Sequence, residues 1–156
     1  MERTLVILKP DAVQRALVGR ILARFEAKGL RLVALKMIRM DRAMAERQYA
    51  VHKGKPFYEP LVRFMTNGPS VLVCLEGKGA VAAVRKMLGA TFGPDAEAGT
   101  VRGDFGVSNR FNLAHASDSP ETAEREIALF FKPDELLDWN PADWNWRYDF
   151  STGECV

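Results

Sequence analysis

The stretch Ser70-Val71-Leu72-Val73-Cys74-Leu75-Glu76 decides how the rest of the chain is interpreted. Its five central residues are all apolar, and turn residues bound it on both sides, beginning with Asn67-Gly68-Pro69. A short apolar run between turn signals is typical of a buried β-strand. We therefore expect a strand over residues 70–76, with the other elements packed around it.

Before this stretch, the residue patterns predict a strand, a helix, a second strand and two more helices. In chain order these are Thr4–Leu8, Val13–Phe25, Leu30–Met40, Asp41–Tyr49 and Pro56–Met65. The first helix has apolar residues at helical spacing, and Gly29 is its expected C-terminal stop. Asp41 is the expected N-cap of the second helix.

After the central strand, Ala80–Leu88 is predicted as a helix. Residues 91–106 are rich in Gly, Pro and Asp, which predicts a long loop, and loops of this length are often functional. Phe111–Ala114 is a candidate strand, and a last helix, Pro120–Phe131, has Ser119 as its N-cap. This order favours an α+β sandwich in which helices cover an antiparallel sheet.

The composition is that of a globular domain. The chain has 156 residues, of which 47% are apolar and 27% charged, and its net charge is +2. These values argue against disorder, collagen and coiled coils. A charge of +2 is also too small to indicate a specific nucleic-acid partner or a basic membrane-binding surface. We expect one domain over residues 1–149, followed by a C-terminal tail over residues 150–156.

The lengths of the apolar runs and the number of cysteines indicate the cellular compartment in which the protein is expected. The longest apolar runs have five residues, whereas a membrane-spanning helix needs about 20. The N-terminal run Leu5–Leu8 is too short for a secretory signal. The two cysteines, Cys74 and Cys155, form no pattern typical of a disulfide framework or a thiolate metal site. We therefore expect a cytoplasmic protein of a reducing compartment, with no membrane partner.

The chain contains only two histidines. His52 lies among polar residues near the end of an expected helix, and we interpret it as a solvated surface side chain. His115 has small neighbours, Ala114, Ala116 and Ser117, which leave its imidazole open to an incoming group. Taken alone, such a histidine is more often structural than catalytic.

Basic residues stand at positions where ligand groups are common. Lys9 follows the first strand, Arg85 lies in the last turns of a helix, and Arg102 lies in the glycine-rich loop. Thr91 lies between the two arginines in the chain. Each of these residues alone is usually a solvated charge or a turn residue. Together they would form a cradle for a polyanion, since guanidinium groups bind pairs of phosphate oxygens.

Several motifs of the chain resemble those of nucleoside diphosphate kinases. The most specific are Gly99-Thr100-Val101-Arg102-Gly103-Asp104-Phe105 and Asn112-x-x-His115-Ala116-Ser117-Asp118-Ser119. The supporting matches are Thr4–Asp11, Gln48-Tyr49 with Pro56-Phe57, and Met87-Leu88-Gly89. The resemblance covers residues 3–148. It implies a ferredoxin-like α/β sandwich, with a four-stranded antiparallel sheet covered by helices.

The resemblance also implies roles for individual residues. His115 matches the nucleophile that takes the terminal phosphoryl group of a nucleoside triphosphate, typically ATP, and passes it to a nucleoside diphosphate. The implied supports around this histidine are Tyr49, Ser117 and Glu126. The implied nucleotide-binding residues are Lys9, Phe57, Arg85, Thr91, Arg102 and Asn112. A neutral imidazole has a free lone pair near pH 7, so two transfers through a phosphohistidine would give ping-pong kinetics.

Within this set, Phe57 matches the ring on which the base stacks, and stacking tolerates every base because each has a π-face. Asn112 and Lys9 match groups near the ribose hydroxyl. No carboxylates are spaced as a metal cage, so Mg²⁺ is expected to arrive on the nucleotide phosphates. Members of the resembled family are homo-oligomers, which makes a hexamer the favoured assembly and a tetramer or dimer the alternatives.

The chain departs from the resembled pattern at a few positions. Asn109 stands where an apolar residue often lines the base pocket, and Arg110-Phe111 replaces a common Gly-Arg pair. Lys55 replaces a frequent arginine near the entrance. By the resemblance, these changes fall on residues that line the base site and its entrance. The tryptophans Trp139, Trp144 and Trp146 are interpreted as packing or subunit-contact residues.

Two other classes of function are considered. The first is a nucleotide- or nucleic-acid-binding module that kept the pocket and lost the activity. The joint presence of His115, Lys9, Arg102 and Glu126 argues against it. The second is a metal-dependent phosphohydrolase, which would release phosphate to water instead of transferring it to a diphosphate.

Overall fold

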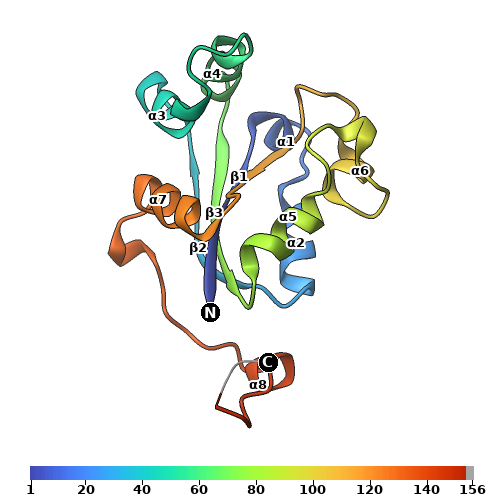
Figure 1. The fold of residues 1–156 in the computed structure, drawn as a ribbon, viewed down its shortest axis with the longest axis vertical. Helices are drawn as coiled ribbons and strands as arrows, with labels where there is room; N and C mark the ends of the chain where they lie inside the picture. The colour runs from blue at the N-terminus through green and yellow to red at the C-terminus, as the bar shows by residue number, and fades with distance from the viewer. Residues whose placement is uncertain (154–156) are drawn as a thin grey trace.

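Four antiparallel strands form the sheet at the centre of the computed structural model, which describes residues 1–153 (Figure 1). The strands are β1 (Glu2–Leu8), β2 (Arg31–Ile38), β3 (Ser70–Gly77) and β4 (Ala114–Ala116), in the order β2-β3-β1-β4. The apolar stretch that predicted a strand is β3, which is buried at all of its positions and pairs with both β1 and β2. The ferredoxin-like sandwich is confirmed.

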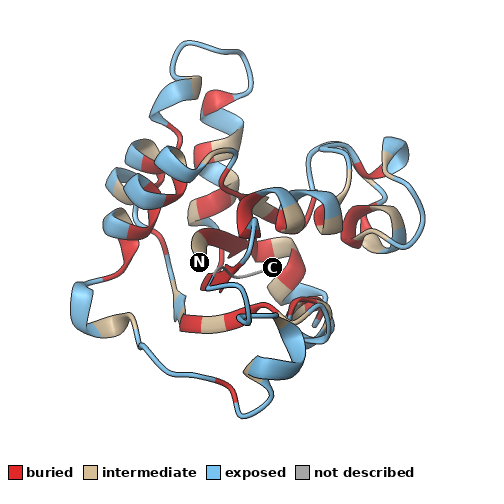
Figure 2. Cartoon of the chain, turned by 60° about the horizontal axis from the view of Figure 1, so that its bottom comes forward, coloured by how far each residue is buried: buried red, intermediate tan, exposed pale blue. Residues whose placement is uncertain are grey.

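The alternation of side chains along the strands divides the apolar core in two. On β1, Val6 and Leu8 face one side of the sheet, and Leu5 and Ile7 face the other. Helices α2 (Val18–Ala27) and α5 (Ala80–Leu88) cover the first side. The second side is covered by α3 (Arg42–Gln48), α4 (Tyr58–Thr66) and α7 (Pro120–Phe130). Figure 2 shows the buried positions along the strands and the inward faces of these helices.

The predicted helix caps are confirmed. The carboxylate of Asp41 accepts a hydrogen bond from the Met44 amide at 2.7 Å, and the hydroxyl of Ser119 accepts one from the Thr122 amide at 3.1 Å. Each cap satisfies a backbone donor that has no partner inside its helix. The cap at Ser119 also fixes where α7 begins, and with it the position of every side chain that this helix directs at the sheet.

The predicted helix Val13–Phe25 is wrong as a single element. The chain forms α1 (Pro10–Gln14) and α2, with Ala16 between them at a φ of +53°. This left-handed residue lets the Leu17 amide bond back to the Ala12 carbonyl, which ends α1. Burial of the Leu17 side chain outweighs the helical preference of the segment.

Two predictions in the following region are corrected. Residues 91–106 are not all loop, because they contain the short helices η2 (Gly93–Asp95) and α6 (Val101–Phe105), and the Thr100 hydroxyl caps α6. The strand predicted over Phe111–Ala114 starts only at Ala114. There the Ala114 amide bonds to the Asn112 carbonyl at 2.8 Å, and Leu113 has a φ of +70°, a tight turn that no strand can continue through.

Two more short helices, η1 (Ala50–His52) and η3 (Pro133–Glu135), follow α3 and α7, and the chain then reaches α8 (Trp144–Arg147) beside the start of β2. The buried Arg31 guanidinium binds Glu76 and the Trp139 carbonyl, and it lies 5.4 Å from the Trp144 ring. Trp144 is partly buried against Arg31, which agrees with a packing role. The side chains of Trp139 and Trp146 are 46% and 92% exposed, and the Trp139 indole donates to the Leu32 carbonyl.

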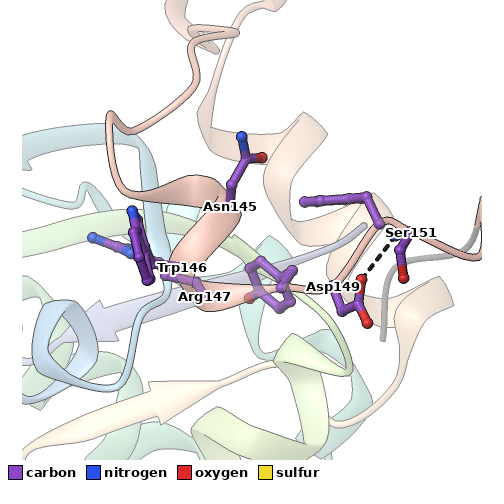
Figure 3. Close-up of a pocket in the computed structure, with 7 residues that line it drawn as sticks. Asn145, Trp146, Arg147, Asp149 and Ser151 are labelled. Carbon is purple, nitrogen blue, oxygen red and sulfur yellow. Dashed lines mark hydrogen bonds between the residues drawn. The ribbon is translucent and has the colours of Figure 1, made fainter.

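A cavity of about 570 Å³ lies in this C-terminal segment and is formed by consecutive residues, 145–151 (Figure 3). The Ser151 amide donates to Asp149 inside it, and the Arg147 guanidinium donates outside it, to Asp143 and the Gly29 carbonyl. Residues 154–156, which include Cys155 and the end of the expected tail 150–156, lie outside the described residues. Within residues 1–153, no helix has the length and apolar character needed to cross a bilayer.

The depth of the core predicts a large difference between two leucine substitutions. Leu72 on β3 is fully buried, whereas Leu137 is 62% exposed. We expect Leu72→Ala to lower the free energy of unfolding by about 2–5 kcal/mol, because it leaves a cavity. The matched substitution Leu137→Ala should cost about 0.5 kcal/mol. Urea unfolding at one protein concentration measures both, and equal losses would contradict the assignment of Leu72 to the core.

Candidate active site

His115 lies in the middle of β4, opposite Ile7 of β1. Its neighbours Ala114 and Ala116 belong to the core under α2 and α5. Because side chains alternate along a strand, the His115 imidazole points to the other side of the sheet, where α7 lies. The imidazole is 24% exposed, so it combines a fixed position with access from outside.

Glu126 of α7 meets this imidazole. Its two carboxylate oxygens lie 2.9 and 3.0 Å from His115 Nε2. The carboxylate is almost fully buried and accepts two further hydrogen bonds, from Ser117 Oγ at 2.6 Å and from Gln48 Nε2 at 2.7 Å. Burial alone would raise the pKa of Glu126, but the hydrogen bonds from His115 and these two donors outweigh it and hold that pKa below its ordinary value. Glu126 is therefore an ionised acceptor.

This contact sets the tautomer of the imidazole. A carboxylate only accepts hydrogen bonds, so His115 Nε2 carries the hydrogen that faces Glu126. The other nitrogen, Nδ1, then has a free lone pair when the ring is neutral. Nδ1 has no hydrogen-bond partner among residues 1–153. The site thus offers one oriented nitrogen nucleophile.

Tyr49 packs beside the imidazole. Its ring lies edge-on to His115, with 6.1 Å between the ring centroids. Burial raises the pKa of the Tyr49 phenol, and the charge of Glu126 raises it further, so the hydroxyl stays protonated. The Tyr49 hydroxyl has no hydrogen-bond partner in the described part of the chain.

Lys9 brings a positive charge to the segment that leads into β4. Its Nζ donates to Asn112 Oδ1 at 2.7 Å, and the Asn112 amide donates in turn to the Thr91 carbonyl at 2.9 Å. Burial and the nearby charge of Arg102 lower the pKa of Lys9 to about 8, against the opposing effect of Asp11. A buried cation of this kind would be stabilised by an anionic ligand.

Arg102 is tied to backbone carbonyls. Its guanidinium donates to the carbonyls of Asn112, Gly89 and Ala114, and burial with the charge of Arg85 lowers its pKa to about 10. Three of its five N–H groups are therefore occupied, one on each nitrogen, which leaves one N–H on each terminal nitrogen for an anion. Arg85 is exposed and reaches the Ala116 carbonyl at 3.4 Å.

These contacts bring the predicted phosphate-binding residues together. Lys9, Arg85 and Arg102 all contact the segment 112–116, which contains the imidazole. Thr91, which is exposed, is joined to the same segment through Asn112. The cations that follow β1 and lie on α5 and α6 thus converge on the strand that carries His115.

A series of aromatic contacts runs from His115 through Tyr49 and His52 to Phe57. Phe57 precedes α4 and is 49% exposed, and the edge of His52 lies against it with 5.2 Å between the ring centroids. His52 also stacks on Tyr49. Burial lowers the pKa of His52, as do the charges of Lys55 and other nearby groups. His52 is therefore partly buried between Tyr49 and Phe57, not the solvated side chain that we expected.

The region that departs from the resembled pattern also has an exposed ring. Phe111 is 51% exposed and packs on Phe64 of α4, with 5.2 Å between the ring centroids. Its neighbours Asn109 and Arg110 are exposed. This loop therefore faces α4, the helix that follows Phe57.

Asp11 and Gln48 belong to the site, although the sequence interpretation gave neither a role. Asp11 accepts a hydrogen bond from the Leu113 amide at 3.0 Å, and the Lys9 amide donates to the Leu113 carbonyl. These contacts hold Leu113 in a left-handed conformation that costs about 1–3 kcal/mol. No periodicity or spacing marks either residue. The signal that could have found them is their position next to Lys9 and Tyr49.

The donor set of the site fits an anion. Within residues 1–153, no group of three or more His, Cys, Asp or Glu side chains could hold a metal ion. The site instead combines an imidazole nitrogen with a free lone pair, a buried carboxylate behind the ring, and three cationic side chains that contact the adjoining segment 112–116. This arrangement can accept a phosphoryl group on His115 Nδ1 and stabilise the charge of the transferred group.

Comparison with known proteins gives the same family from three directions. The family model described as "Nucleoside diphosphate kinase" matches residues 2–136. The nucleoside diphosphate kinase of Thermococcus kodakarensis is 56% identical over 148 residues, 92% of this chain and 85% of the relative. That of Synechococcus elongatus is 54% identical over 149 residues, 96% of this chain and 100% of the relative.

Solved structures agree. A halophilic nucleoside diphosphate kinase from Halobacterium salinarum, solved in complex with CDP, has a TM-score of 0.93 and 47% identity. The match covers 95% of this chain and 99% of that one. A family protein from Babesia bovis has a TM-score of 0.92 and 44% identity, over 95% of this chain and 100% of its own.

The buried ammonium of Lys9 predicts a pH dependence of stability. Its pKa is about 8 in the folded protein and about 10.4 in an unfolded chain, so the unfolded chain binds more protons between these values. The contribution of Lys9 to the free energy of unfolding should therefore rise as the pH increases through this range. Urea unfolding at several pH values from about 7 to 10 should show this rise in the wild type, and less of it in Lys9→Met. Parallel curves for the two proteins would refute it.

Proposed function

Because the chain belongs to the nucleoside diphosphate kinase family, we propose that His115 is the residue that carries the phosphoryl group between its two substrates. The chain is a phosphotransferase that moves the terminal phosphoryl group of a nucleoside triphosphate to a nucleoside diphosphate by a ping-pong mechanism. The observation that carries the proposal is the contact of His115 Nε2 with Glu126, which leaves Nδ1 free to attack.

In the first half-reaction, the lone pair of His115 Nδ1 forms a bond to the terminal phosphorus of the triphosphate. The bond from that phosphorus to the bridging oxygen breaks, and its electron pair leaves with the nucleoside diphosphate. The imidazole gains positive charge, which the ionised Glu126 offsets across the Nε2 hydrogen bond. In the second half-reaction, a terminal oxygen of another diphosphate attacks the same phosphorus and the ring leaves with its electron pair.

Charge accumulates on the oxygens of the phosphoryl group during transfer. Lys9, Arg85 and Arg102 supply positive charge around β4 before the substrate arrives, and preorganised charge needs no rearrangement during the reaction. The proposed role of Thr91 is a further phosphate contact at the same edge. Arg102 would contact the phosphate while keeping its hydrogen bonds to the Asn112 and Ala114 carbonyls.

The proposed nucleotide position follows from the residues around the imidazole. Phe57 would stack on the base, while Asn112 and Lys9 would bind near the ribose hydroxyl. Tyr49 and Ser117 would support the imidazole and its carboxylate. Stacking tolerates many bases, so we propose broad base tolerance. The related structure solved with CDP supports a site that takes a pyrimidine nucleotide.

A kinase reaction of this family generally uses a divalent metal ion, and we propose Mg²⁺ as part of the substrate. The cationic site is suited to a polyphosphate, and phosphate oxygens are the ligands that Mg²⁺ prefers. The ion would enter on the nucleotide and reduce the charge that the protein must stabilise.

We propose three further properties of the protein. The first is assembly as a homo-oligomer, with a hexamer favoured over a tetramer or dimer, because the resembled family assembles in this way. The second is a cytoplasmic location, which rests on the cysteine usage of the sequence. The third is the division of the chain into a catalytic domain over residues 1–149 and a tail over residues 150–156.

A labelling experiment tests the relay on His115. Mixing the protein with γ-labelled ATP and no acceptor should label the wild type with an acid-labile bond, and an added diphosphate should remove the label. His115→Ala should take no label and should lose activity by on the order of a thousandfold or more. His52→Ala, which changes the only other histidine, should still be labelled.

Failure to label the intact wild-type protein would overturn the relay. A labelled protein that released phosphate mainly to water, even with diphosphate present, would instead favour the phosphohydrolase. A protein that bound nucleotides without labelling would favour the binding module.

Chelation tests the proposed metal. Transfer should stop when EDTA exceeds the divalent cations, and added Mg²⁺ should restore it. Because the proposed ion binds the nucleotide, the dependence on Mg²⁺ should follow the nucleotide concentration and not the protein concentration. A protein-bound metal that survives gel filtration, measured by elemental analysis, would contradict this.

A further inference from the structure

Gln48 is a buried amide in the active site that the proposed transfer steps do not use. It is the last residue of α3, a helix separate from both β4 and α7, and it is 2% exposed. Its Nε2 donates to Glu126 Oε1 at 2.7 Å and lies 3.2 Å from His115 Nε2. Gln48 thus approaches the two side chains that define the nucleophile.

The orientation of this amide depends on Glu126. The Gln48 Oε1 atom is buried and has no hydrogen-bond partner among residues 1–153. Turning the amide over would place this oxygen against a carboxylate oxygen, and two acceptors at such a distance repel. The Gln48 Nε2 therefore stays hydrogen-bonded to Glu126, and Oε1 is left without a partner. An unpaired oxygen in a buried site is destabilising. An apolar side chain would avoid this cost but would remove the donor.

We propose that Gln48 is a positioning residue for the phosphoryl transfer, acting through Glu126. This inference rests on the proposed relay on His115. Ser117 donates to Glu126 Oε2 and Gln48 donates to Oε1. These two hydrogen bonds fix the carboxylate so that both of its oxygens face His115 Nε2. The hydrogen stays on Nε2, and Nδ1 stays available to the phosphorus.

Within the described part of the chain, Gln48 and His115 are the only groups that donate to Glu126 Oε1. The charged and titratable groups facing Glu126 are His115 from β4, Arg125 from α7 and Tyr49 from the end of α3. The nearest Arg125 nitrogen is 3.9 Å from Oε1, beyond hydrogen-bond distance. The Tyr49 hydroxyl has no partner within residues 1–153. Loss of Gln48 would leave charge on Oε1 that only His115 can satisfy.

This geometry predicts the effect of Gln48→Met, which keeps the length of the side chain and removes the donor. The Glu126 carboxylate would lose the hydrogen bond from Gln48, so its negative charge should favour the protonated, positively charged form of His115 more strongly. The acid limb of the kcat/KM profile should then move to higher pH by about one unit. We expect kcat to fall about tenfold, with KM for both nucleotides unchanged, because Gln48 contacts no proposed substrate position.

A double-mutant cycle with Glu126→Gln separates positioning from a general structural effect. If Gln48 acts through the carboxylate, Gln48→Met should have little further effect on kcat when Glu126 is already an amide. Gln14→Met is the matched control, since Gln14 is the only other glutamine and is exposed on α1. It should leave kcat and the pH profile unchanged.

Additive losses in the cycle, a parallel rise in KM, or an unshifted acid limb would each overturn the proposal. If Gln48→Met does not fold, Gln48→Asn gives the same test, because it keeps the amide and withdraws it by one methylene. In the wild type, NMR should show slow solvent exchange for the Gln48 side-chain amide, and fast exchange would also overturn the proposal.

The labelling experiment keeps this inference separate from the relay itself. Gln48→Met should still form the phosphoenzyme on His115, at a rate about tenfold lower. If the wild type is labelled and Gln48→Met behaves identically, only the positioning role fails. If the wild type takes no label, the relay fails and this inference fails with it.

Discussion

The hydrogen bond between His115 Nε2 and the buried carboxylate of Glu126 is the interaction on which the site depends. It joins the short edge strand β4 to α7, and it decides which nitrogen of the ring is free. A carboxylate is stable at this depth only because several donors surround it. The fold supplies these donors from three separate elements: the strand, its following turn and the end of α3.

A second constraint is the concentration of positive charge around the segment that leads into the same strand. Lys9 and Arg102 are buried, and burial lowers the pKa of each. Their hydrogen bonds to segment 112–114 hold the chain that leads into His115, including the strained Leu113. The same cations therefore hold the strand in place and, in the proposed function, lie where a polyphosphate would bind. A bound substrate anion would supply the negative charge that balances these buried cations.

Much of the fold was predictable because its signals are local. The apolar run of β3, the helix Ala80–Leu88 and the caps at Asp41 and Ser119 all depend on residues close in the chain. The wrong predictions occur where a distant contact outweighs local preference. Burial of Leu17 divides one expected helix, and the turn at Leu113, held by Asp11, shortens the expected strand. The candidate site residues were named through a family resemblance, since neither histidine stands out by spacing.

The sequence by itself determined the layered α+β architecture and the family, because periodicity, caps and motif spacing are properties of neighbouring residues. Only the tertiary structure decided which nitrogen of the proposed nucleophile, His115, is free. The choice of Nδ1 depends on Glu126, eleven positions away, and on Gln48, which is still more distant in the chain. The burial that lowers the pKa of Lys9 likewise comes from segments brought together by the sheet. Distances and burial of this kind arise from packing, which no local pattern encodes.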